Sequence, residues 1–152
     1  MAFNKDQFRA LITDVLLATD LYSKSAVELL MLTCAVESNF GTYIEQITGP
    51  AMGVFQMEPA THDDIWNNFL KYKQKVMFVV DKYAATDRAE ELKWNLAYAI
   101  LMARVHYLRV PAPLPKSTDK LGLAMYWKDH YNTHQGKGTV MDALEKYEEY
   151  CI

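Results

Sequence analysis

The chain has 152 residues, the size of one globular domain, and 51% of them are hydrophobic. This composition excludes a disordered or collagen-like chain, and the net charge of -3 argues against a protein dedicated to nucleic acid, which would carry a basic surplus. No apolar run is long enough to span a membrane, and no signal-peptide stretch follows Met1. The cysteines, Cys34 and Cys151, stand alone, so we expect free thiols and no structural zinc.

The spacing of the apolar residues predicts a mainly α-helical protein that forms a single domain over residues 1–152. Each expected helix starts at a polar residue whose side chain can cap the free backbone N–H groups of the first turn. The segment from Thr61 is expected to continue through Val79, and the segment from Asp87 to about Val110, where prolines end it. The expected helix starts in chain order are Asn4, Ser25, Thr61, Asp87, Thr118 and Thr139.

Five of the six glycines fall in two irregular segments, residues 39–60 and residues 131–138. Long irregular segments inside a compact domain usually carry function, because a rigid scaffold holds them while their side chains stay accessible. A short β-hairpin between Thr42 and Phe55 is the only strand pairing that the pattern allows. We therefore expect a functional site where these two segments border the helices.

A carboxylate, Glu37, lies at the end of the second expected helix. Its neighbours on the same helix face are Leu30, Thr33 and Cys34, which are largely apolar. If this carboxyl is buried, desolvation raises its pKa, and a carboxylic acid that is protonated near neutral pH can donate a proton to a leaving oxygen, as in glycoside cleavage. The alternative is a helix-terminal glutamate that is half in solvent.

The residues around Glu37 carry a family resemblance. The stretch Val36-Glu-Ser-Asn-Phe40, followed by Gly53-Val-Phe-Gln-Met-Glu-Pro-Ala-Thr61, resembles the soluble lytic transglycosylases of the lysozyme-like superfamily. In that family Glu-Ser-x-Phe ends a helix, and Gly-Leu-Met-Gln and Met-Pro-x-Thr follow. Two looser motifs come later: residues 95–99 resemble Asn-Ile-x-x-Gly with alanine for glycine, and residues 131–140 resemble Tyr-Asn-Ala-Gly-x-Gly-x-Val with two extra residues.

The resemblance implies a fold, an activity and a set of site residues. The fold would be the helical domain of transglycosylases and goose-type lysozymes, with at most a small β-hairpin. Glu37 would be the catalytic acid and base that cleaves the bond between N-acetylmuramic acid and N-acetylglucosamine and leaves a 1,6-anhydro end. Tyr131 would orient this acid, and no metal or organic cofactor is implied. The residues that would bind substrate or support the groove are Ser38, Phe55, Gln56, Met57, Asn95 and Asn132.

The resemblance also implies partners and a setting. The substrate would be the peptidoglycan glycan strand, and the compact form suggests a bacteriophage member that contacts other virion proteins. We expect synthesis in the bacterial cytoplasm and action on the wall in the periplasm, reached with the virion or through a holin. We expect neither nucleic acid nor a membrane span as part of this function.

Two alternatives stay open. A hydrolytic lysozyme acting on the same bond needs a second group to position water, and Glu45 is the candidate for that carboxylate. A protein with the same fold but without catalysis could instead serve as a virion component or a wall-binding module. A metal site formed by His130 and His134 is disfavoured, and we expect His106, Trp94 and Trp127 to pack in the interior.

Overall fold

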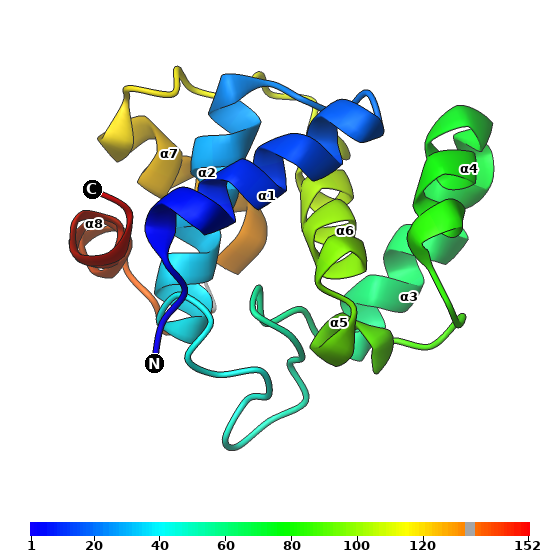
Figure 1. Cartoon of the computed structure of the whole chain (residues 1–152), viewed down its shortest axis with the longest axis horizontal. Helices are drawn as coiled ribbons and strands as arrows, with labels where there is room; N and C mark the ends of the chain where they lie inside the picture. The colour runs from blue at the N-terminus through cyan, green and yellow to red at the C-terminus, as the bar shows by residue number, and fades with distance from the viewer. Residues whose placement is uncertain (133–135) are drawn as a thin grey trace.

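The computed structural model describes residues 1–132 and 136–152, and these residues form eight α-helices joined by loops (Figure 1). One 3-10 turn and one π-helical turn complete the regular structure of these two ranges. The prediction of a mainly α-helical protein is therefore confirmed. The elements are α1 (Lys5–Ala18), α2 (Lys24–Ser38), α3 (Pro59–Asn68), η1 (Leu70–Tyr72), α4 (Gln74–Tyr83), α5 (Glu91–Trp94), α6 (Leu96–Leu108), α7 (Lys120–Trp127), η2 (Lys128–Asn132) and α8 (Val140–Cys151).

The first and last helices begin where the sequence predicts. The Asn4 side chain accepts hydrogen bonds from two backbone N–H groups in the first turn of α1. Thr139 and Asp142 cap α8 reciprocally, each side chain accepting from the other residue's backbone N–H. In both cases the capping residue and its partners are close in sequence, so a local pattern is sufficient to locate the helix start.

Two other helix starts differ from the prediction by one or two residues. The cap of α2 is Ser23 rather than Ser25, and its hydroxyl accepts from the Ala26 backbone N–H at 3.0 Å. The cap of α7 is Asp119 rather than Thr118. Serine, threonine and aspartate cap helices about equally well, so neighbouring polar residues compete and the tertiary structure decides between them.

The segment expected to run as one helix from Thr61 to Val79 is broken. Helix α3 begins at Pro59, which suits the first turn because it has no backbone N–H to leave unpaired. The helix stops at Asn68, and the 3-10 turn η1 then redirects the chain into α4. The apolar spacing predicted the helical content of this segment correctly but not the interruption.

The second long segment also divides, at Asn95. Helix α5 begins at Glu91, not at Asp87, and ends after a single turn. Asn95 then leaves helical geometry, and its side chain accepts from the Tyr98 backbone N–H to start α6. Asparagine competes with helix formation by capping, which explains the break inside an apolar, helix-forming stretch.

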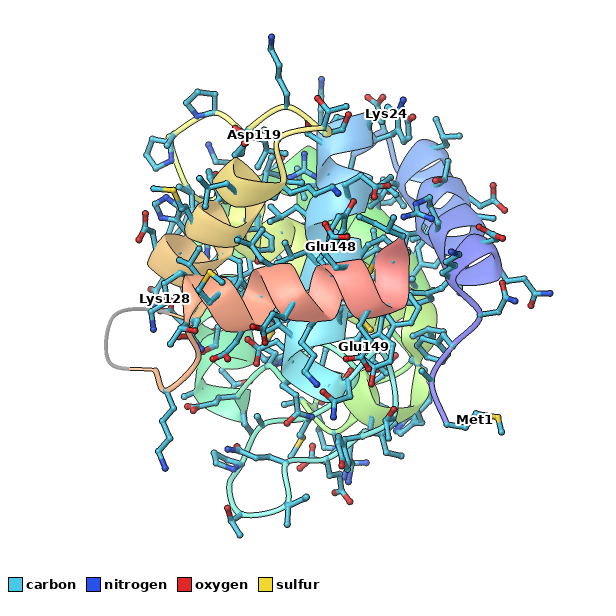
Figure 2. The ribbon with its side chains drawn as sticks, turned by 90° about the vertical axis from the view of Figure 1, so that its left-hand side faces the viewer. Met1, Lys24, Asp119, Lys128, Glu148 and Glu149 are labelled. Atoms are coloured by element: carbon cyan, nitrogen blue, oxygen red, sulfur yellow. The ribbon has the colours of Figure 1, made fainter. Side chains whose placement is uncertain are left out.

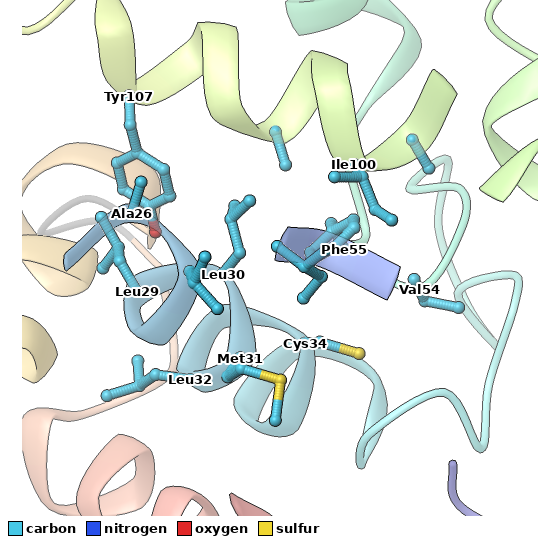
Figure 3. Packing of buried hydrophobic residues seen from close by; sticks show 14 of the residues in the cluster. Ala26, Leu29, Leu30, Met31, Leu32, Cys34, Val54, Phe55, Ile100 and Tyr107 are labelled. Atoms are coloured by element: carbon cyan, nitrogen blue, oxygen red, sulfur yellow. The ribbon is translucent and has the colours of Figure 1, made fainter. Parts of the chain in front are cut away.

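Helix α2 is the centre of the molecule. Its middle turns, residues 29–32, are almost completely inaccessible to solvent on every side. A helix that is apolar all round must be surrounded, and α1, α6, α7 and α8 pack against it. Figure 2 shows α8 crossing in front of α2, and Figure 3 shows Leu30 of α2 among the side chains of Ile100 and Tyr107 from α6. The end of α2, which carries Glu37, is therefore held on a rigid support.

No β-hairpin forms between α2 and α3. In this described stretch Met52 makes isolated antiparallel bridges to both Glu45 and Met57 instead. The chain turns at Gly53, where φ is +79° and an added Cβ would collide with the Leu92 carbonyl oxygen. Glycine is required there because it adopts positive φ and permits this close approach.

The remaining expectations about packing and membranes have mixed outcomes. Cys34 and Cys151 are free and buried. Trp94, expected in the interior, is 61% exposed at the end of the short helix α5. No helix within the described ranges is both long and apolar enough to cross a membrane.

Candidate active site

Glu37 lies in the last turn of α2, just before the chain reverses direction. Asn39, the residue that ends α2, adopts left-handed geometry with φ of 49°. Ser38 is fully buried, and its hydroxyl donates to the Cys34 carbonyl and accepts from the Gly41 backbone N–H at 2.8 Å. These bonds stabilise the sharp turn after the helix. The structure therefore places the Ser38 side chain inside the turn, not at a surface where it could contact substrate.

Among residues 1–132 and 136–152, one side chain donates directly to the Glu37 carboxyl. The indole Nε1 of Trp127, itself buried at the end of α7, donates to Glu37 Oε2 at 2.9 Å. Burial raises the pKa of Glu37 to about 7, although the hydrogen bond from Trp127 opposes this rise. Near neutral pH the carboxyl is thus divided between its protonated form, which can donate a proton, and its ionised form, which can accept one.

Glu37 lines a cavity of about 660 Å³. The walls come from the end of α2, the segment between α2 and α3, the start of α3, α6, η2 and the residues after η2. Both glycine-bearing segments therefore border the same space. Four predicted site residues besides Glu37 line this cavity, namely Gln56, Met57, Tyr131 and Asn132. The lining residues are Glu37, Gln46, Thr48, Ala51, Gln56, Met57, Glu58, Thr61, His106, Tyr131, Asn132, Gly136, Lys137 and Gly138.

Gln56 is held in a strained turn beside Glu37. Its φ is 48°, in the left-handed region, and its side-chain amide donates to the Gly53 carbonyl at 2.9 Å. The neighbouring Met57 is fixed by paired backbone hydrogen bonds with Met52 at 2.9 and 3.1 Å. A positive φ at a residue other than glycine costs energy and persists where surrounding contacts enforce it, as at binding sites.

Tyr131 lines the cavity, but its hydroxyl is engaged elsewhere than expected. It donates to the backbone carbonyl of Phe55 at 2.7 Å, and its ring stacks on Tyr107 with centroids 5.2 Å apart. The residue that hydrogen-bonds to Glu37 is Trp127, which lies one turn earlier along the same helical run. Tyr131 therefore joins two walls of the cavity, and the Glu37 carboxyl accepts its hydrogen bond from the indole instead.

Phe55 and Asn95 do not reach the cavity. The Phe55 side chain is buried in the interior, within the cluster that also holds Leu30 and Ile100 (Figure 3), and only its carbonyl supports the site. The amide nitrogen of Asn95 donates to Glu91 Oε2 at 2.6 Å and to the Tyr83 carbonyl at 2.7 Å. Asn95 therefore links α4, α5 and α6, and it is not among the residues that line the cavity.

Lys128, a partly buried residue of η2, holds together the wall that follows this turn. Lys128, labelled in Figure 2, donates from Nζ to the Asn132 side-chain oxygen and to the carbonyls of Gly136 and Gly138, at 2.7, 3.0 and 2.6 Å. All three of these partners line the cavity. A single ammonium thus satisfies three oxygens that would otherwise repel one another, and Asn132 serves this wall as a supporting residue.

Glu45 borders a second, smaller space next to the first. This cavity of about 240 Å³ is lined by Glu37 and Gln56 as well, so the two spaces meet at the acid. The Glu45 carboxylate accepts from Lys93 Nζ at 2.9 Å, and its side chain is 63% exposed. The structure therefore brings Glu45 near the same site, paired with a cation.

Two residues of this site were expected only to pack in the interior. Trp127 does pack there, yet its indole N–H reaches Glu37, and His106 lines the cavity. Neither role has a signal in the sequence spacing, since Trp127 and Glu37 are 90 residues apart.

Among the described residues no three histidine, cysteine or acidic side chains meet as a metal site. His130 packs on Tyr126, and His134 lies outside the described residues.

The site thus combines one carboxyl of raised pKa, a fixed indole donor and a polar cavity bounded by three separate parts of the chain. Cavities of this size, with a few convergent polar groups, are typical of binding sites. Comparison of the chain with protein-family models, with curated proteins and with solved structures finds no match. Its function is therefore inferred from these residues and their geometry.

Proposed function

We propose that this protein is a lytic transglycosylase that cleaves the peptidoglycan glycan strand between N-acetylmuramic acid and N-acetylglucosamine, with Glu37 as the general acid and base. One observation carries the proposal: the Glu37 carboxyl, whose burial raises its pKa to about 7, lines the 660 Å³ cavity. Proton donation at neutral pH requires such a carboxyl, and an elongated sugar strand requires an open, polar space.

The proposed reaction uses one carboxyl twice. Protonated Glu37 gives its proton to the glycosidic oxygen, and the bond from that oxygen to C1 of the muramoyl sugar breaks. The C6 hydroxyl of the same sugar then bonds to C1 and returns its proton to Glu37, so a 1,6-anhydro end forms without water. Gln56 and Met57 would contact the sugars beside Glu37, since both line the same cavity.

Hydrolysis of the same bond is the second candidate, and the position of Glu45 favours it. This carboxylate and Glu37 both line the smaller cavity, and the hydrogen bond from Lys93 Nζ at 2.9 Å holds the Glu45 carboxylate where it could orient water. In the transglycosylase proposal Glu45 has no chemical role. A non-catalytic wall-binding or virion protein is the remaining alternative.

The products of digestion distinguish the two reactions. We expect purified peptidoglycan to yield muropeptides with 1,6-anhydro ends, each lighter by one water than a hydrolytic product, when analysed by mass spectrometry. We expect Glu45→Gln to change the rate by about twofold or less, because a partly exposed ion pair contributes little. Reducing ends in the products, together with loss of activity in Glu45→Gln, would instead establish hydrolysis.

The pH dependence of cleavage should report the Glu37–Trp127 pair. The free enzyme must hold Glu37 protonated, so kcat/KM should fall as pH rises above about 7, the pKa of this carboxyl. Trp127→Phe removes the hydrogen bond that lowers this pKa, so the fall should shift to higher pH. A pH profile of peptidoglycan clearing, recorded for the parent and for Trp127→Phe, measures the fall and its shift. An unshifted profile in Trp127→Phe would contradict the assignment of that fall to Glu37.

The biological setting follows from the same proposal. The partner is the glycan strand, and no cofactor takes part in the chemistry. As a bacteriophage protein it would be made in the bacterial cytoplasm and reach the periplasm with the virion or through a holin. In the first of these routes it would contact neighbouring virion proteins.

A further inference from the structure

His106 occupies the cavity wall that α6 provides. It lines the 660 Å³ space together with Glu37 and Tyr131. Its ring packs against the Tyr131 ring in an edge-to-face arrangement, with ring centroids 4.8 Å apart and planes at 63°. The proposed chemistry gives this imidazole no task, although it lies in the same cavity as the acid.

The hydrogen bond at one ring nitrogen determines where His106 carries its proton. Arg109 Nη2 lies 2.8 Å from His106 Nδ1. A guanidinium has only donors, so Nδ1 must accept, and the proton of the neutral ring must be on Nε2. In the described part of the chain Nε2 has no hydrogen-bond partner, so it is the ring nitrogen that remains available to the cavity.

Asp64 on the neighbouring helix α3 keeps Arg109 in place. Arg109 Nη1 donates to Asp64 Oδ2 at 2.7 Å, and Asn68 donates to the other carboxylate oxygen at 2.6 Å. Helices α3 and α6 pack together (Figure 1), so the carboxylate, the guanidinium and the imidazole form one connected row that ends at the cavity. Such second-layer partners fix the orientation and tautomer of a functional histidine.

The same surroundings keep the ring uncharged. Burial and, to a smaller extent, the positive charge of Arg109 lower the pKa of His106 to about 4, although Asp64 opposes this fall. At neutral pH His106 is therefore a neutral imidazole with a single N–H. It can donate one hydrogen bond into the cavity, and it does not compete with Glu37 as a source of protons.

We propose that His106 binds the substrate by donating a hydrogen bond from Nε2–H to an acceptor oxygen of the sugar strand, with Arg109 and Asp64 as positioning residues. The inference rests on the proposed function, because it takes a glycan as the occupant of the cavity. The acetamido carbonyl and the hydroxyl oxygens of the sugars are acceptors of this kind. A binding measurement that needs no catalysis tests it separately from the reaction.

The probe is tri-N-acetylchitotriose, titrated into Glu37→Gln protein by calorimetry so that no cleavage occurs. In this background His106→Phe keeps a ring beside Tyr131 but has no N–H, and we expect the affinity to fall about tenfold. His106→Gln is the matched control, because its amide nitrogen can take the place of Nε2–H. We expect its affinity to stay within about threefold of the parent.

Three results would overturn the inference: no binding of the trimer, equal affinity in His106→Phe and its parent, or equal loss in the Phe and Gln variants. Nitrogen-15 NMR of the histidine rings, without ligand, shows which ring nitrogen of His106 carries the proton. A proton on Nδ1 of His106 at pH 7 would overturn the tautomer assignment. Binding that depends on His106, in a protein that leaves peptidoglycan uncleaved, would overturn the proposed function and support the His106 contact. Cleavage of peptidoglycan by the parent, together with unchanged trimer binding in His106→Phe, would support the proposed function and overturn the His106 contact.

Discussion

Replacement of Glu37 by glutamine is expected to slow peptidoglycan cleavage by about 10²–10⁴-fold, the usual contribution of a general acid and base. The amide has nearly the shape of the carboxyl, and its oxygen can still accept from Trp127, which donates at 2.9 Å in the parent. The packing of α2 should therefore be unchanged. What the variant loses is the proton that the leaving oxygen requires. The rate is measured as loss of turbidity of a suspension of purified peptidoglycan.

Glu145→Gln is a suitable control for this variant. Glu145 is an exposed residue of α8, so the same change of side chain there should leave the rate unaltered. Equal clearing by Glu37→Gln and the parent would reject Glu37 as the catalytic group. If neither the parent nor Glu37→Gln clears the peptidoglycan suspension, but both bind peptidoglycan, the protein is a non-catalytic wall-binding protein.

The second large effect is expected on stability, at Glu91. This residue is 1% exposed, and its carboxylate accepts four hydrogen bonds: from the Ala85 and Thr86 backbone N–H groups, the Thr86 hydroxyl and the Asn95 amide. Glu91→Ala leaves these donors without an acceptor, and we expect a loss of about 3 kcal/mol in the free energy of unfolding. Urea denaturation followed by circular dichroism measures the loss.

Glu91 also predicts how stability depends on pH. Burial alone would raise the pKa of this carboxyl, but the hydrogen bonds from Ala85, Thr86 and Asn95 outweigh that effect and lower it. Its stabilisation is therefore fully present above the unfolded-state value of 4.5 and is lost as pH falls through the lower folded-state pKa. In that acidic range the parent should lose stability more steeply than Glu91→Ala.

The neighbouring Glu90 supplies the control for the stability experiment. It is exposed, so Glu90→Ala should change the free energy of unfolding by about 0.5 kcal/mol or less. A similarly small change in Glu91→Ala would show that the four-bond cluster does not hold the junction between α4 and α6. The activity of either variant is not needed for this test.

The sequence predicted correctly the features that depend on neighbours along the chain. Helical content follows from apolar spacing, and the caps at Asn4 and Thr139 follow from side chains that bond within three residues. Two further features also depend only on neighbours along the chain. They are the position of Glu37 at the end of an apolar helix and the two glycine-bearing segments that could border it. These local patterns, together with the family resemblance, pointed to a candidate site around Glu37.

The tertiary structure decided which side chains complete that site. Trp127 reaches Glu37 only because α7 packs against α2, and His106 faces the cavity only because α6 lies between α2 and α3. The hydroxyl of Tyr131 likewise finds its partner in the backbone of Phe55, 76 residues away. Contacts between distant residues depend on how whole helices pack, and one-dimensional spacing carries no information about that packing. The sequence therefore determined where a carboxyl with apolar neighbours lies, and the fold determined its pKa, its hydrogen-bond partner and the residues around it.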